Sequence, residues 1–98
     1  MWRQGDIYIE RIDRIPDGAR KLGHCVLAEG EVTGHKHQVV DIETAELYES
    51  SGKQYLEVKT ESAVVSHDEH GPVTLPKGTY VVWKQREYTP EEIRIVRD

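Results

Sequence analysis

The chain has 98 residues, of which 37% are hydrophobic and 32% are charged, and its formal net charge is −5. This length predicts one domain spanning residues 1–98, and the mixture is typical of a globular chain rather than a disordered one. No apolar run approaches the roughly 20 residues that a membrane-spanning helix needs, and no signal-peptide pattern follows Met1. An acidic chain is also a poor match for a protein that coats long DNA or RNA.

Apolar residues recur mostly with a period of two along the chain, which predicts strands rather than helices. Turns are expected at residues 15–18 and 76–78, where Pro and Gly stand close together, and a hairpin loop is expected at 50–53. Residues 89–92 are typical of a helix start, so a single helical turn leading into a final strand at 93–96 is expected there. The other expected strands are, in chain order, 6–11, 25–28, 38–42, 45–49, 55–59 and 79–83, and residues 63–65 and 72–75 are short apolar runs.

Seven or eight short strands in one small domain predict a mostly β fold of barrel or sandwich-like architecture. Cys25 is the only cysteine, so an intrachain disulfide and a zinc cluster of thiolates are both excluded. That cysteine content fits the reducing cytoplasm, where we expect the protein to work. We expect Cys25 itself to be a small buried apolar side chain.

Histidines form two short groups that are the strongest chemical signal in the sequence. His35 and His37 stand two residues apart, so on a strand their side chains point to the same face. His67 and His70 stand three residues apart, a spacing that brings side chains together on a turn. The carboxylates between them, Asp68 and Glu69, are candidates for orienting an imidazole or joining a metal site, while the fifth histidine, His24, stands alone.

The residues leave two kinds of chemistry open. Neutral imidazole is a common ligand of zinc and other divalent transition metals, so all four clustered histidines are candidate metal ligands. Histidine is also the side chain best suited to general acid–base catalysis near pH 7. A second candidate surface offers cations, an amide and an aromatic ring for binding a phosphate and a base. It consists of Lys36, Lys84, Gln85, Arg86 and Tyr88.

Two resemblances to known families add to these alternatives. The stretch 34–37, Gly-His-Lys-His, followed by the Pro-Lys-Gly turn at 76–78, is similar to the cupin pattern, in which such histidines hold a metal ion. The combination of residues 26–35, 67–72 and 85–90 resembles the small homodimeric CRISPR-associated ring nucleases. That resemblance implies a homodimer that degrades cyclic oligoadenylate second messengers and damps type III CRISPR signalling.

The leading hypothesis is therefore a phosphodiesterase that needs no cofactor and cleaves cyclic oligoadenylate to linear products. A ribose 2′-hydroxyl would attack the adjacent phosphorus, with His35 and His37 as the acid–base pair and a cation such as Lys84 stabilising the phosphoryl oxygens. His67 and His70 complete the candidate catalytic group. The alternatives are a cupin-like protein whose four histidines bind zinc or a similar metal, and a binding module without catalytic activity.

Overall fold

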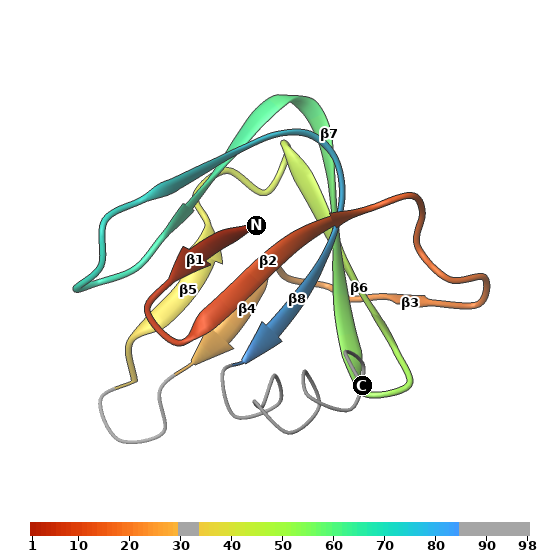
Figure 1. Ribbon diagram of the computed structural model, residues 1–98, viewed down its shortest axis with the longest axis horizontal. Coiled ribbons are helices and arrows are strands. Elements are labelled where there is room, and N and C mark those ends of the chain that lie inside the picture. Colours follow the sequence, from red (N-terminus) through yellow and green to blue (C-terminus); the bar gives the residue numbers. More distant parts are fainter. Residues whose placement is uncertain (30–33, 85–98) are drawn as a thin grey trace, which may run out of the picture.

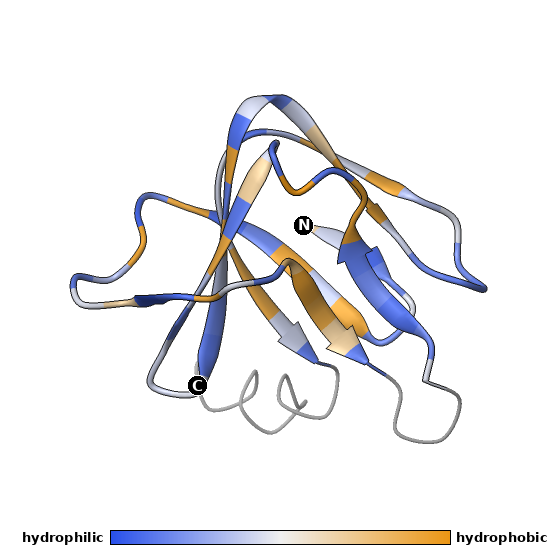
Figure 2. Cartoon of the chain, turned by 180° about the vertical axis from the view of Figure 1, so that it is seen from behind, coloured by the Kyte–Doolittle hydropathy of each residue, from blue (hydrophilic) through white to orange (hydrophobic). Residues whose placement is uncertain are grey.

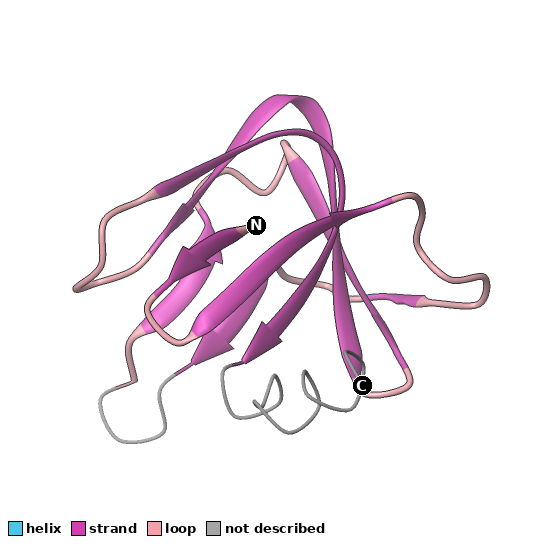
Figure 3. Ribbon diagram, viewed as in Figure 1, coloured by secondary structure: helices cyan, strands magenta, loops and turns pink. Residues whose placement is uncertain are grey.

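The computed structural model describes residues 1–29 and 34–84, and every regular element among them is a β-strand (Figures 1 and 3). The prediction of a mostly β fold with seven or eight strands is confirmed. The helical turn and strand expected at 89–96 lie outside the described residues. The strands are β1 (Trp2–Gln4), β2 (Ile7–Ile12), β3 (Arg20–Lys21), β4 (Val26–Glu29), β5 (Lys36–Val39), β6 (Ala45–Ser50), β7 (Lys53–Ser66) and β8 (Val73–Lys84).

All strand pairs are antiparallel, and the two longest strands, β7 and β8, lie at the centre of the sheet. The main order is β1-β2-β8-β7-β5-β4, while β6 pairs with β7 and β3 pairs with β6. Strand β7 therefore changes partner along its length: its first half pairs with β6, and its last residues, Val65 and Ser66, pair with β5. The sheet folds over on itself around this strand, and the result is the barrel-like fold expected from the sequence (Figure 1).

The turn predicted at residues 76–78 is wrong, because β8 runs through these residues without ending. The expected strand 79–83 and residues 73–75 of the apolar run before it belong to β8, just as the expected strand 55–59 and the apolar run 63–65 belong to β7. Val58 pairs with Gly78 and Ser62 with Pro76, so three residues of β7 lie opposite one residue of β8. Such an irregularity bends a hairpin instead of closing it, and the hairpin arches over the top of the molecule in Figure 1.

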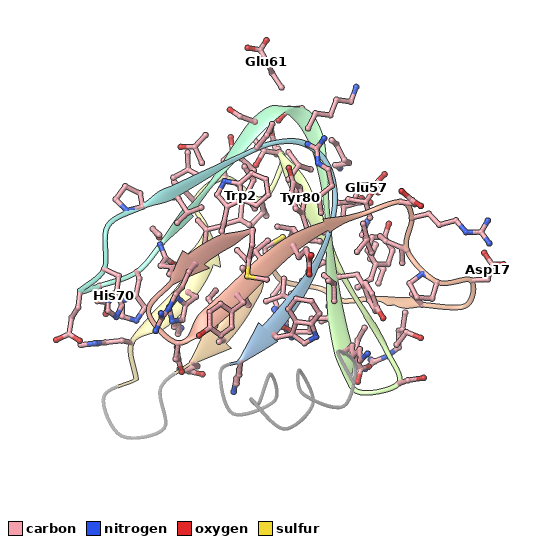
Figure 4. All side chains as sticks on the ribbon, viewed as in Figure 1. Trp2, Asp17, Glu57, Glu61, His70 and Tyr80 are labelled. Atoms are coloured by element: carbon pink, nitrogen blue, oxygen red, sulfur yellow. The ribbon has the colours of Figure 1, made fainter. Side chains whose placement is uncertain are left out.

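Side chains from β2 and β8 hold this bend. Arg11 donates hydrogen bonds to the carbonyl oxygen of Lys77 at 2.8 Å and to the hydroxyl of Tyr80 at 3.1 Å. The Tyr80 hydroxyl in turn donates to the carbonyl oxygen of Pro76. Trp2 packs edge-on against the Tyr80 ring, with 5.4 Å between the ring centroids (Figure 4). The bend is therefore fixed mainly by contacts between residues that are far apart in sequence.

The hydrophobic core lies between the folded halves of the sheet, and it follows the period-two pattern of the sequence. Inward residues alternate with polar ones along the strands, as the hydropathy colours in Figure 2 show. Cys25 is buried, as predicted, and belongs to this core. The largest fully buried side chains are Tyr80, Ile7, Ile9, Leu47, Leu56 and Leu75. In the described part of the chain, no helix is long and apolar enough to cross a membrane.

The hydrogen bonds of Glu46 on the sheet surface predict how the free energy of unfolding depends on pH. Glu46 accepts hydrogen bonds from Lys21 at 2.8 Å, from the Tyr48 hydroxyl at 2.8 Å and from Lys59 at 3.2 Å. These bonds, that from Lys21 above all, lower the pKa of the Glu46 carboxyl from 4.5 to about 2. Because the folded state holds the carboxylate more tightly, this stabilisation is complete above pH 4.5 and is lost as the pH falls towards 2.

We therefore expect Glu46→Gln to lower the free energy of unfolding at neutral pH and to flatten its decline between pH 4.5 and about 2. Urea unfolding at a series of pH values measures both effects. Glu61→Gln, which changes an exposed carboxyl at the bend of β7, is the control and should keep the wild-type slope. Equal slopes in E46Q and the wild type would contradict the assignment.

Candidate functional site

Three segments that are distant in sequence meet at one end of the sheet. They are the turn between β1 and β2, the start of β5, and the connection between β7 and β8. The pairing of Gln38 with Ser66 brings the segment with His35 and His37 beside the segment with His67 and His70. The turn between β1 and β2 adds Gly5 and Asp6, and His70 is labelled in this region in Figure 4.

Gln4 fixes His37 from within the protein. The amide nitrogen of Gln4 donates to two carbonyl oxygens, that of Val65 at 3.0 Å and that of Gly71 at 2.9 Å. Its amide oxygen therefore faces the His37 ring, where it lies 2.8 Å from Nδ1. Because this oxygen can only accept, His37 Nδ1 carries a proton and donates it. Gln4 and His37 are the two buried polar residues among those described.

The other nitrogen of His37 faces a carboxylate. His37 Nε2 lies 3.1 Å from Oδ1 of Asp6. With Nδ1 protonated, a neutral His37 presents a lone pair at Nε2, and a carboxylate oxygen also offers only lone pairs. Burial, and next the neighbouring His67, lower the pKa of His37, although Asp6 acts in the opposite direction. The lowered pKa favours the neutral ring, so the Nε2 lone pair of His37 and the lone pairs of Asp6 then lie side by side, 3.1 Å apart.

The imidazole rings of the four histidines form one cluster. The His37 ring lies 4.1 Å from that of His67 and 6.4 Å from that of His70, between ring centroids. His67 lies 4.7 Å from His70 and 5.8 Å from His35. The structure therefore brings together all four histidines that the sequence singled out. His24 is separate, in a different pocket beside Cys25.

His35 lies between two carboxylates of the β7–β8 connection. Its Nδ1 is 3.4 Å from Oε1 of Glu69, and its Nε2 is 3.8 Å from Oδ2 of Asp68. Both carboxylates are largely exposed, so they are able to move with little loss of packing. These two carboxylates therefore flank the His35 ring at the edge of the cluster.

Gly5 makes room for this arrangement. A Cβ atom at this position would lie 2.6 Å from Nε2 and Cδ2 of His70 and 3.4 Å from Cε1 of His37. Its φ of +58° also lies in the left-handed region that favours glycine. The turn between β1 and β2 therefore needs glycine for both its backbone and its contact with the histidines.

These groups line a pocket of about 200 Å³ that we call the histidine pocket. Among the described residues that line it, three are acidic and one is a lysine, beside the four histidines. Among residues 1–29 and 34–84, no three donor side chains already share a coordination point. The lining consists of Asp6, Ala28, Glu29, His35, His37, His67, Glu69, His70 and Lys84.

Unlike the histidines, the predicted phosphate-binding residues are not all placed at the pocket. Lys84 lines the histidine pocket, whereas Lys36 is exposed and is not part of its lining, because it alternates with buried His37 along β5. The other three, Gln85, Arg86 and Tyr88, lie outside the described residues. Gln4, Gly5, Asp6 and Glu29 were not predicted as site residues, because a Gln-Gly-Asp turn and a single glutamate are both common in sequences.

The fold and the site define a small all-β domain with a histidine-lined pocket at one end of its sheet. Residues 3–85 match the family described as a domain of unknown function (DUF8820), so the chain belongs to that family. All four clustered histidines fall within the matched region. No curated protein and no solved structure matches the chain.

We expect Gly5→Ala to displace His70 and to destabilise the fold by about 1–2 kcal/mol, the cost of a left-handed non-glycine residue, plus the clash. Gly52→Ala is the matched control, since Gly52 also has a positive φ but no atom lies within 4 Å of its Cβ position. Thermal unfolding measures stability, and the ring-proton NMR resonances of His70 measure displacement. Unshifted His70 resonances in G5A would contradict the packing described here.

Proposed function

We propose that the histidine pocket binds a divalent transition-metal ion, with His37 Nε2 and Asp6 Oδ1 as its first two ligands. The observation that carries this proposal is the pair of acceptors facing each other at 3.1 Å. Zinc binds histidine nitrogen and carboxylate oxygen at about 2.0–2.2 Å, so two tetrahedral ligands lie about 3.3 Å apart. The observed spacing needs only a small adjustment to hold an ion.

The surroundings of His37 support a metal ligand. Metal-binding histidines normally donate their second N–H to a fixed acceptor, which sets the tautomer and the ring orientation. Gln4 supplies that acceptor, and the two carbonyl oxygens that it binds keep it from turning. The ligand nitrogen is therefore oriented before any ion binds.

Further ligands would come from side chains close to this pair. His70 stacks parallel to His37, with an interplanar angle of 10°, and His35 and Glu69 also line the pocket. An imidazole and an exposed carboxylate reach a new position by rotating about side-chain bonds, without a change in the sheet. Nitrogen and oxygen donors of this kind suit zinc, cobalt, nickel or copper.

Metal titration tests this proposal directly. Protein purified without an affinity tag and treated with EDTA should bind about one Zn²⁺ or Co²⁺ per chain, measured by calorimetry or by competition with a chromogenic chelator. His37→Ala should weaken binding by at least about tenfold, since even outer-shell partners of a metal contribute that much. His24→Ala, which removes the histidine outside the cluster, should bind like the wild type. Failure of the wild-type protein to bind would refute the proposal.

Asp6→Asn separates a metal site from a simple ion pair. The asparagine amide would donate to His37 Nε2, so the metal-free variant should be as stable as the wild type or more stable by up to about 1 kcal/mol. Zn²⁺ should then raise the melting temperature of the wild type and not that of D6N. A metal-free D6N protein that is markedly less stable would mean that Asp6 holds a protonated His37 instead.

Metal-free cleavage of cyclic oligoadenylate is the second candidate, and one observation favours it. A groove of about 390 Å³ adjoins the histidine pocket, shares Glu29 and Lys84 with it, and is also lined by Trp83. An adenine base can stack on an indole, and the volume falls within the range of small-molecule sites, about 300–1,000 Å³. His35 and His37 would be the acid–base pair, in a homodimer that holds both halves of the ring. The three acidic side chains in the histidine pocket oppose the binding of phosphates.

Incubation with cyclic tetra-adenylate, with and without EDTA, distinguishes the two candidates. Linear products that form in EDTA and disappear in a variant lacking both His35 and His37 would favour the metal-free nuclease. Our metal proposal expects no conversion in EDTA. Chromatography of the products provides the measurement.

A further inference from the structure

His67 occupies the centre of the histidine cluster, yet its environment differs from that of the other three rings. It is the one histidine with a ring contact to each of His35, His37 and His70 among those described. It lies at the start of the β7–β8 connection and lines the histidine pocket. A central imidazole would ordinarily be the first choice as a metal ligand.

The backbone prevents this role. Nδ1 of His67 accepts hydrogen bonds from the backbone N–H groups of Glu69 at 3.0 Å and of His70 at 3.2 Å. A nitrogen that accepts these bonds uses its lone pair, so a neutral His67 ring carries its proton on Nε2. Neither nitrogen then has a lone pair free for a metal ion. His67 would become a ligand only by releasing both amides and opening its own turn.

The two backbone hydrogen bonds to Nδ1 leave His67 able to act as a hydrogen-bond donor. The 67–70 backbone occupies its Nδ1, which leaves the Nε2–H as the remaining polar group of this pocket-lining ring. We propose that His67 donates its Nε2–H to a small anionic oxygen ligand, a carboxylate or phosphate group, that binds at the metal ion. This inference rests on the proposed metal site and adds the class of its ligand.

The rest of the pocket supports an oxyanion of small size. The pocket of about 200 Å³ is smaller than typical drug-sized sites, which begin at about 300 Å³. Lys84, the one lysine or arginine among the described lining residues, adds a positive charge at the pocket. A bound metal ion offsets the acidic side chains that would otherwise repel such a ligand, so metal and oxyanion would bind in that order.

The substitution His67→Asn separates the acceptor role of Nδ1, which holds the turn, from the donor role of Nε2–H. The Asn side-chain oxygen can accept the same backbone N–H groups in an Asx turn, so the 67–70 turn is kept. The donor on the far edge of the ring is lost. His67→Ala, which removes both properties, shows how much the turn itself matters for folding.

The experiment measures Co²⁺ binding first and anion binding second, from the visible absorption of the Co²⁺-loaded full chain. We expect H67N to take up Co²⁺ with wild-type stoichiometry and with an affinity within about threefold. Titration with inorganic phosphate in one arm and acetate in the other identifies the preferred oxyanion. For that anion, H67N should bind about tenfold more weakly, the effect of one hydrogen bond to a charged group.

The outcomes separate this inference from the proposal on which it depends. If the wild type takes up no Co²⁺, the metal site and the role of His67 both fail. If H67N loses Co²⁺ while remaining folded, His67 is a ligand and only the inference fails. If the wild type takes up Co²⁺ but neither anion changes its spectrum, or if both proteins bind the anion equally, the inference fails as well.

Discussion

The buried amide of Gln4 is the contact on which the rest of the site depends. It connects β1 to the end of β7 and to Gly71 in the β7–β8 connection, and its oxygen accepts the Nδ1 proton of His37. Every polar atom of this amide is thereby used, in a place where an unsatisfied group costs about 1–3 kcal/mol. One side chain thus both closes the sheet at this end and sets the tautomer of His37, so fold and chemistry are coupled here.

Much of the fold could be predicted from the sequence because period-two burial is a local signal. The hairpin of β6 and β7 around Gly52 and the strands near Ile7 and Leu27 follow from it. The bend at Pro76 could not be predicted, because it depends on Arg11 and Tyr80, which contact each other only in the folded chain. Locally, Pro-Lys-Gly is typical of a turn, and the pairing with β7 overrides that preference.

The site, like the fold, could be predicted only in part from the sequence. His35 and His37 could be paired by their spacing, and His67 and His70 by theirs, but nothing local joins the two groups; strand pairing at Gln38 and Ser66 does so. Gln4, Gly5 and Asp6 escaped prediction because a glutamine, a glycine and an aspartate in a turn are common residues. Their roles depend on the residues that they contact in the folded chain. Lys36 was expected to join His37, and the alternation of β5 places it outside the pocket lining.

The central claim is that His37 and His67 carry their protons on different ring nitrogens. Nitrogen NMR of the histidine rings tests this claim most directly. In the metal-free protein at neutral pH, we expect His37 to carry its proton on Nδ1 and His67 to carry its proton on Nε2. One equivalent of Zn²⁺ should shift the Nε2 resonance of His37 and leave His67 in the same tautomer. A His37 ring protonated at Nε2, with no response to Zn²⁺, would contradict the account.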